Sequence, residues 1–164
     1  MIFFCNQQQS NEPIIAKVRM AMFEKILYPT DFSDEALKAM DFVVSLKDAG
    51  AKEVVVLHVI EKGGFDAIAR YAIKDIVEIE KNMKRRAMKE MRPIEDALKK
   101  KGFKVKVIIV TAVPYMGILD IEKKEKVSAI VMGSRGKTNI TEILLGSVSE
   151  KVVRRAKVPV LVVR

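Results

Sequence analysis

The sequence is poor in the residues that build disulfides and zinc sites. It has one cysteine, Cys5, and one histidine, His58, in 164 residues. A single cysteine excludes an intrachain disulfide, and one Cys with one His excludes a zinc site of the Cys/His type. No apolar run approaches the roughly 18 residues that a membrane-spanning helix needs, and the first ten residues lack the segments of a secretory signal. We therefore expect a cytoplasmic protein.

The chain is ordinary in composition but strongly basic. Hydrophobic residues make up 49% and charged residues 31%, which fits one globular domain and excludes disordered and collagen-like chains. The formal net charge is +9, and between Lys81 and Lys101 nine basic side chains stand against three acidic ones. This segment is either a solvated helix face or a contact surface for nucleic acid. Because it has no interleaved aromatic residues and no nucleic-acid-binding signature, the pattern favours the solvated face.

Apolar runs typical of buried strands alternate with segments of helical periodicity. The expected strands cover residues 24–29, 53–59, 104–110, 127–133 and 158–164. Between them we expect helices at residues 34–50 and 66–101, one opened by Pro114, and one at about 146–156. Pro93 lies inside the longest stretch, which predicts one bent helix or two consecutive ones. The alternation predicts an α/β fold of three layers, a five-stranded parallel sheet with helices on both faces.

The two ends of the chain differ in character. Residues 1–22 show no clear period and are expected to form an N-terminal extension, either a flexible tail or a segment that packs on a neighbour. A single domain then covers residues 23–164. The last strand is strongly apolar and is expected at the edge of the sheet, so we expect a homodimer that pairs through Val158 to Val163.

Polar residues follow the first strand, where an open parallel sheet binds ligands. Pro29, Thr30 and Asp31 occupy this position. Asp31 has the chemistry to hold a ribose hydroxyl or a phosphate-bound metal ion. Alternatively, Asp31 or Ser33 simply caps the helix that follows.

The stretch Met132 to Glu150, MGSRGKTNITEILLGSVSE, contains Gly-Lys-Thr and invites comparison with a phosphate-binding P-loop. A Walker sequence requires a further glycine five positions before that Gly, and residue 131 is valine. The glycines instead fit the pattern Gly133-x-x-Gly136, nine residues, Gly146-Ser147. The stretch is therefore not a Walker loop.

This glycine spacing suits a phosphate site made by two turns. Glycine allows close approach of the backbone and positive φ, so Gly133 and Gly136 could turn their N–H groups toward an anion. Ser147 and Ser149, at the start of a helix, add hydroxyl groups to the free amides of its first turn. Alternatively, Gly133 merely ends a strand and Ser147 merely caps a helix.

With this glycine spacing, the sequence resembles the ATP-binding branch of the universal stress protein family. The family fingerprint, Gly-x-x-Gly, nine residues, Gly-Ser/Thr, is matched at Gly133, Gly136, Gly146 and Ser147. The segments KILYPTDFSDEALKAM and VVVLHV also resemble the start of the family and its second strand. The resemblance covers about residues 22–164. Family members often have glycine where this chain has Ala112 and aspartate where it has Ser128.

The resemblance implies an adenine nucleotide alpha hydrolase-like fold with a sheet of order 3-2-1-4-5. It also implies a protein that forms a dimer through its last strand and binds ATP across strands 1 and 4. A divalent cation, Mg²⁺ or Mn²⁺, commonly accompanies the triphosphate, and Asp31 would lie near it. The residues implied near the nucleotide are Pro29, Thr30, Asp31, Val59, Met132, Gly133, Arg135, Gly136, Gly146, Ser147, Val148 and Ser149. An unidentified protein partner would respond to the bound nucleotide.

No residue stands out as catalytic. His58 lies inside an apolar strand, which favours a structural histidine over a general base, and no acid or serine at suitable spacing makes a triad with it. The Ser-Gly-Gly loop of ATP pyrophosphatases and the paired histidines of nucleotidylyltransferases are both missing. We expect a regulatory or stress-response protein with at most slow ATP hydrolysis, and keep a weak ATPase and a nucleic-acid-associated protein as alternatives.

Overall fold

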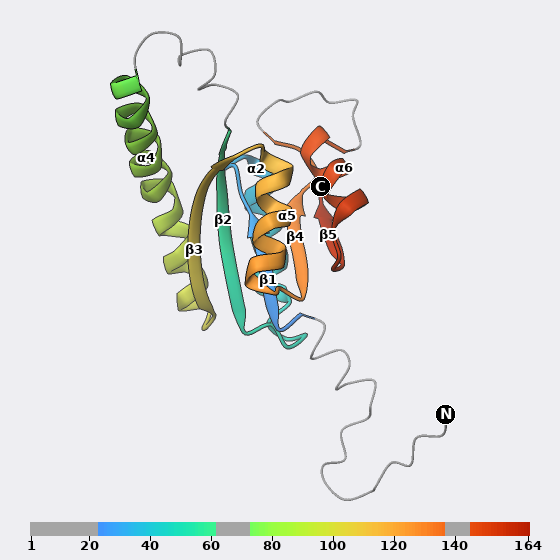
Figure 1. Cartoon of the computed structure of the whole chain (residues 1–164). Coiled ribbons are helices and arrows are strands. Elements are labelled where there is room, and N and C mark those ends of the chain that lie inside the picture. Colours follow the sequence, from blue (N-terminus) through green and yellow to red (C-terminus); the bar gives the residue numbers. More distant parts are fainter. Residues whose placement is uncertain (1–22, 62–72, 137–144) are drawn as a thin grey trace, which may run out of the picture.

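The computed structural model describes residues 23–61, 73–136 and 145–164. Five parallel strands form one sheet in the order β3-β2-β1-β4-β5 (Figure 1). The strands are β1 (Lys25–Pro29), β2 (Glu53–Glu61), β3 (Lys104–Ala112), β4 (Ala129–Gly133) and β5 (Val160–Val163). The α/β fold class and the strand order 3-2-1-4-5 are thereby confirmed.

Helices cover both faces of this sheet (Figure 1). They are α2 (Asp34–Ser45), α4 (Ile73–Lys100), α5 (Pro114–Glu125) and α6 (Ser147–Arg155). Successive strand residues point to opposite faces. Ile26 and Tyr28 therefore pack with α2 and α4, while Leu27 packs with α5 and α6. Of the helices in the described ranges, none is both long and apolar enough to cross a membrane.

The helix α4 runs through Pro93 without interruption. Of the two expected arrangements, the pair of consecutive helices is therefore wrong, and the expected residues 66–72 lie outside the described part. Met91, Ile94 and Leu98 are buried against the sheet on both sides of the proline, and this packing holds the helix together despite the lost hydrogen bond.

Basic side chains share the solvent side of α4 with the exposed Val77, Met83 and Met88, and three of the basic side chains are paired within the helix. Lys84 pairs with Glu80 at 2.8 Å, and two further ion pairs are Arg85–Glu78 and Lys99–Glu95. Exposed pairs of this kind are typical of a solvated helix surface.

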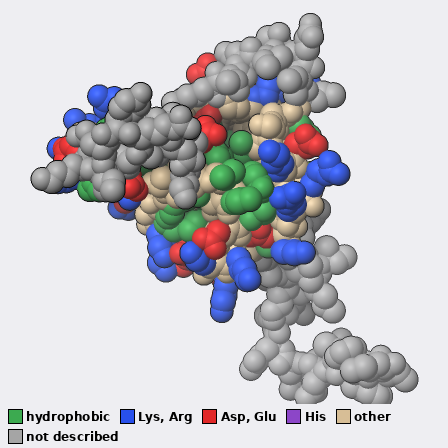
Figure 2. All heavy atoms as spheres, turned by 45° about the horizontal axis from the view of Figure 1, so that its top comes forward, with side chains coloured by type: hydrophobic (Ala, Val, Ile, Leu, Met, Phe, Trp, Pro, Cys, Tyr) green, Lys and Arg blue, Asp and Glu red, His purple; other side chains and the backbone are tan. Residues whose placement is uncertain are grey.

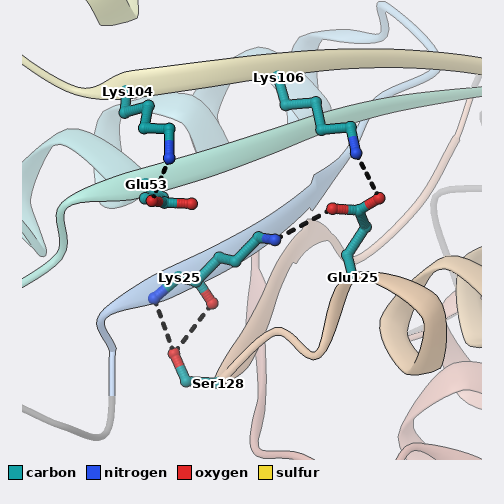
Figure 3. Close-up of polar contacts among 6 residues, drawn as sticks. All are labelled: Lys25, Glu53, Lys104, Lys106, Glu125 and Ser128. Atoms are coloured by element: carbon teal, nitrogen blue, oxygen red, sulfur yellow. Dashed lines mark hydrogen bonds and ion pairs between the residues drawn. The ribbon is translucent and has the colours of Figure 1, made fainter.

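Polar contacts link the amino ends of β1, β2, β3 and β4, as Figure 3 shows. Its members are Lys25, Glu53, Lys104, Lys106, Glu125 and Ser128. Glu125 accepts from Lys106 at 2.7 Å and from Lys25 at 3.0 Å, and these hydrogen bonds hold the pKa of its carboxyl below the ordinary value. Ser128 accepts from the Lys25 N–H at 3.0 Å and donates to the Lys25 carbonyl at 2.9 Å. At this position the serine joins β1 to the start of β4.

The carboxyl ends of β1 and β4 lie at the point where the strand order reverses. From β1 the chain proceeds to β2 and β3 on one side, and from β4 to β5 on the other. In the described part, β1 and β4 pair at Ile26↔Ala129 and Leu27↔Ile130, before either strand has ended. A switch point with strands that stop pairing early is where open α/β sheets hold ligands.

Candidate functional site

The turn after β1 is fixed by backbone contacts with β2. The Thr30 N–H donates to the Leu57 carbonyl at 2.8 Å, which extends the pairing of β1 with β2 by one residue. The Thr30 hydroxyl then accepts from the Phe32 N–H at 3.1 Å. Thr30 is buried although it is polar. The position of the following residue, Asp31, is consequently well defined.

Asp31 both supports the cap of α2 and faces the glycine stretch. Its Oδ1 accepts from the Ser33 N–H at 3.1 Å and from the Ser33 hydroxyl at 2.6 Å. Ser33 in turn caps α2 by accepting from the Ala36 N–H at 3.4 Å, as expected. A Cβ placed on Gly136 would lie 2.5 Å from Asp31 Oδ2. Asp31 and Gly136, which are far apart in sequence, therefore meet at this edge of the sheet.

Phe32 and His58 close one side of this turn. Phe32 has φ +63°, a left-handed conformation that is uncommon for a bulky residue, and such strain clusters at functional sites. Its ring stacks on the His58 imidazole with centroids 4.5 Å apart. His58 Nδ1 lies 2.8 Å from the Thr30 carbonyl oxygen. These contacts agree with the structural role expected for His58.

Close packing against backbone, not positive φ, explains why glycine is needed at position 133. Glycine allows both close approach and positive φ, but among the described glycines only Gly50 and Gly102 have positive φ. A Cβ on Gly133 would lie 2.8 Å from the backbone carbonyl carbon of Glu35. Glycine therefore lets the first turn of α2 pack directly on the end of β4.

Gly146 joins the start of α6 to the end of β4. Its N–H donates to the Ser134 carbonyl at 2.8 Å, and a Cβ on it would lie 3.3 Å from that same oxygen. The Ser149 hydroxyl lies 2.7 Å from the Ser134 carbonyl and 2.9 Å from the Gly146 carbonyl, so it braces the turn from inside. Ser147 is exposed.

The N-terminus of α6 has no side-chain cap among the described residues. Gly146 is its N-cap residue with extended backbone, φ −69° and ψ 160°. The amides of the first turn have no partner within a helix, and together they carry the positive end of the helix dipole. This end of α6 therefore offers N–H donors suited to phosphate oxygens.

The Arg135 side chain extends toward α2. Its guanidinium Nη2 lies 3.4 Å from Glu35 Oε1, and the two side chains are 17% and 13% exposed. Two buried polar atoms here, Arg135 Nε and Ser134 Oγ, have no hydrogen-bond partner within the described part of the chain. Sequence patterns did not indicate Glu35, which resembles any other acidic residue in a first helical turn.

The remaining residues of the expected site contribute backbone or apolar surface. Pro29 ends β1, and the Met132 side chain is buried in the core beneath α5 and α6. Val59 and Val148 are partly buried and pack against the same core. A Cβ on Gly117 of α5 would lie 3.1 Å from both Val59 methyl groups. The side chains of Met132 and Val59 are thus largely committed to packing.

The face that contains the carboxyl ends of the strands is partly apolar. Figure 2, which looks between these strand ends and the side of α5, shows hydrophobic side chains gathered in the middle, with Lys and Arg side chains to the right of them and below. Exposed hydrophobic residues near the end of β3 include Val113, 43% exposed, and Met116, 52% exposed. In residues 23–61, 73–136 and 145–164, no three His, Cys, Asp or Glu side chains form a group that could hold a metal ion. The arrangement suits an anionic ligand with an apolar part.

Comparison with known proteins identifies relatives over most of the chain. Residues 22–164 match the family model of the universal stress protein family. Universal stress protein MJ0577 of Methanocaldococcus jannaschii is 41% identical over 155 residues, which cover 87% of this chain and 96% of that protein. Universal stress protein YxiE of Bacillus subtilis is 34% identical over 148 residues, 87% of this chain and 100% of that protein.

Solved structures share the fold. A structure of MJ0577, described as a test case for structure-based assignment of biochemical function, has a TM-score of 0.79 at 43% identity, covering 87% of this chain and 96% of that one. A universal stress protein solved in complex with cAMP has a TM-score of 0.58 at 24% identity, covering 87% of this chain and 97% of that one.

Proposed function

The chain belongs to the universal stress protein family, and we propose that it binds ATP at the carboxyl ends of β1 and β4 and acts as a nucleotide-dependent regulatory module in the stress response. One observation carries the proposal. The uncapped N-terminus of α6 and the contact between Gly136 and Asp31 both lie where β1 and β4 have stopped pairing. Open amides at a helix N-terminus bind phosphate. The cAMP complex of a family member supports an adenine nucleotide as the ligand.

Each part of the nucleotide has its own set of residues in this proposal. Adenosine is bordered by Pro29, Thr30, Asp31, Val59, Met132 and Gly133, and the phosphates by Arg135, Gly136, Gly146, Ser147, Val148 and Ser149. The amides of the first turn of α6 donate to the phosphates. The Ser149 hydroxyl acts indirectly, because it already donates to the turn that positions those amides.

A divalent cation, Mg²⁺ or Mn²⁺, would neutralise phosphate charge when ATP is bound. The described residues fit a cation carried by the nucleotide better than a resident metal, since they contain no cluster of three suitable side chains. Asp31 is the residue nearest to such a role. Its Oδ1 is held by Ser33, while Oδ2 faces Gly136.

Regulation is the proposed outcome of binding, with at most slow hydrolysis of ATP. Fast hydrolysis needs a base positioned on the attacking water. The His58 ring is occupied by the Thr30 carbonyl and by stacking on Phe32. Bound nucleotide would instead bias the connection from residue 134 to residue 146 and the surface offered to a protein partner. Such a population shift requires the partner to bind the two nucleotide states with different affinity.

The proposal also covers the domain bounds, the cellular location and the oligomeric state of the protein. Residues 23–164 would form the single domain and residues 1–22 an N-terminal extension, in a cytoplasmic protein. Two copies would pair through Val158 to Val163, because β5 is an edge strand and its residues 160–162 are only partly buried. A single monomer mass by light scattering at micromolar concentration would contradict the dimer.

The test of ATP binding combines release and titration. Nucleotide set free from purified, denatured protein is identified by mass spectrometry, and ATP is then titrated into wild type, Gly136→Val and Gly146→Val by calorimetry. We expect each variant to lose affinity by roughly tenfold or more, about 1.4 kcal/mol, because the new side chain would clash with Asp31 or with the Ser134 carbonyl. Ala49→Val, at the opposite end of the sheet, is the control. Unchanged affinity in both glycine variants would refute the site.

A further inference from the structure

The ion pair between Arg135 and Glu35 connects two elements that border the proposed site. Arg135 follows β4, and Glu35 lies in the first turn of α2, 100 residues away in sequence. Both side chains are largely buried, at 17% and 13% exposure, so solvent screens their attraction only weakly. The pair is therefore a specific contact and not one of the many exposed pairs of the surface.

The same pair leaves the guanidinium poorly satisfied. Arg135 Nη2 and Glu35 Oε1 are 3.4 Å apart, longer than the roughly 2.8 Å of a good charge-assisted hydrogen bond. Arg135 Nε is buried and has no hydrogen-bond partner among the described residues. A buried donor without a partner costs free energy. A group that offers several oxygens to the guanidinium fork would hold Arg135 better than Glu35 does.

A phosphate group is such a partner, and Arg135 starts from the turn where the phosphates are proposed to lie. We propose that Glu35 is an internal competitor for Arg135. It holds the guanidinium against α2 in the absence of nucleotide, and Arg135 exchanges this carboxylate for phosphate oxygens when ATP binds. Glu35 thereby lowers the affinity of the protein for nucleotides whose phosphates bind Arg135. The contacts of the first turn of α2 then depend on whether phosphates are bound. The inference rests on the proposed ATP site.

Calorimetric titration with ATP and with adenosine tests this exchange. For Glu35→Gln we expect the Kd for ATP to fall roughly fivefold, the scale of a modest coupling between sites, and the Kd for adenosine to stay unchanged. Asp34→Asn is the matched control. It removes one negative charge from the same turn, but Asp34 is exposed and makes no ion pair within the described ranges. In an Arg135→Gln background, Glu35→Gln should bring no gain.

Three results would overturn the inference. An unchanged or raised Kd for ATP in Glu35→Gln, with ATP bound normally by wild type, refutes the competition and leaves the proposed function standing. An equal gain in Asp34→Asn would show a general charge effect. Failure of wild type to bind ATP at all would refute the proposed function and this inference together. Glu35→Asp, which keeps the charge but shortens its reach, carries the test if Glu35→Gln does not fold, and it should tighten ATP by a smaller factor.

Discussion

Glu122 is a buried carboxylate that positions the edge strand β5. It lies in α5 and is 5% exposed, and its Oε1 accepts from the Lys157 N–H at 2.6 Å and from the Val158 N–H at 3.2 Å. A hydrogen bond to a charged group contributes about 1.5–3 kcal/mol, so the loss of two in Glu122→Ala should destabilise the protein by about 3–6 kcal/mol. This is a large part of the about 5–15 kcal/mol that stabilises a typical domain.

Urea unfolding monitored by circular dichroism measures this loss. Glu122→Gln keeps a neutral acceptor and should lose about half as much free energy as Glu122→Ala. Asp120→Ala, an exposed change on the same helix, should cost less than about 1 kcal/mol. The reasoning would be refuted by a Glu122→Ala loss below about 1 kcal/mol, or by equal losses for the Ala and Gln variants.

Three further predictions concern packing and pH. Gly133→Ala should destabilise the protein by about 1–3 kcal/mol in thermal unfolding and weaken ATP binding, because its Cβ would overlap the backbone of α2; an unaffected Tm would contradict this. The pKa of Glu125 is lowered by its hydrogen bonds with Lys106 and Lys25, so its ion pairs stabilise the fold fully above about pH 4.5 and lose this effect as pH falls through the folded pKa. Glu125→Gln should therefore be less stable than wild type at pH 7 in urea unfolding, and the difference should shrink as pH falls below about 4.5. Burial raises the pKa of the Tyr28 hydroxyl to about 12. The neutral hydroxyl therefore stabilises the fold fully below about pH 10, and this stabilisation is lost as pH rises toward 12. Tyr28→Phe should weaken the fall of unfolding free energy at alkaline pH, and an identical pH profile would refute the assignment.

Periodicity predicted the layers of the fold well, because burial on two faces of a sheet imposes a pattern on neighbouring residues. Strand boundaries were less accurate where distant groups intervene. The last strand was expected from residue 158 but begins at Val160, since the amides of Lys157 and Val158 donate to the Glu122 carboxylate. The strand expected from residue 127 begins at Ala129. The strand order came from the resemblance to a family and not from periodicity.

The sequence predicted which backbone segments meet at the candidate site, but not which distant side chains pair there. Gly146 lies beside the end of β4, where its N–H donates to the Ser134 carbonyl, and the role of Gly136 and Gly146 toward a ligand stays a prediction. The contact between Gly136 and Asp31 arises because β1 and β4 are neighbours in the sheet. The Arg135–Glu35 pair has no local signature, because its members lie 100 residues apart and meet only after α2 packs on β4.

The anchoring of both ends of the connection between β4 and α6 has a consequence for engineering. Ser134 accepts from the Gly146 N–H at 2.8 Å and from the Ser149 hydroxyl at 2.7 Å, so the two ends of this connection are held side by side. The entropy of closing a flexible loop grows only with the logarithm of its length, about 0.6 kcal/mol for each doubling. A peptide inserted between residues 136 and 145 should therefore leave the sheet folded. A series of such insertions would show which changes affect ligand binding without affecting folding.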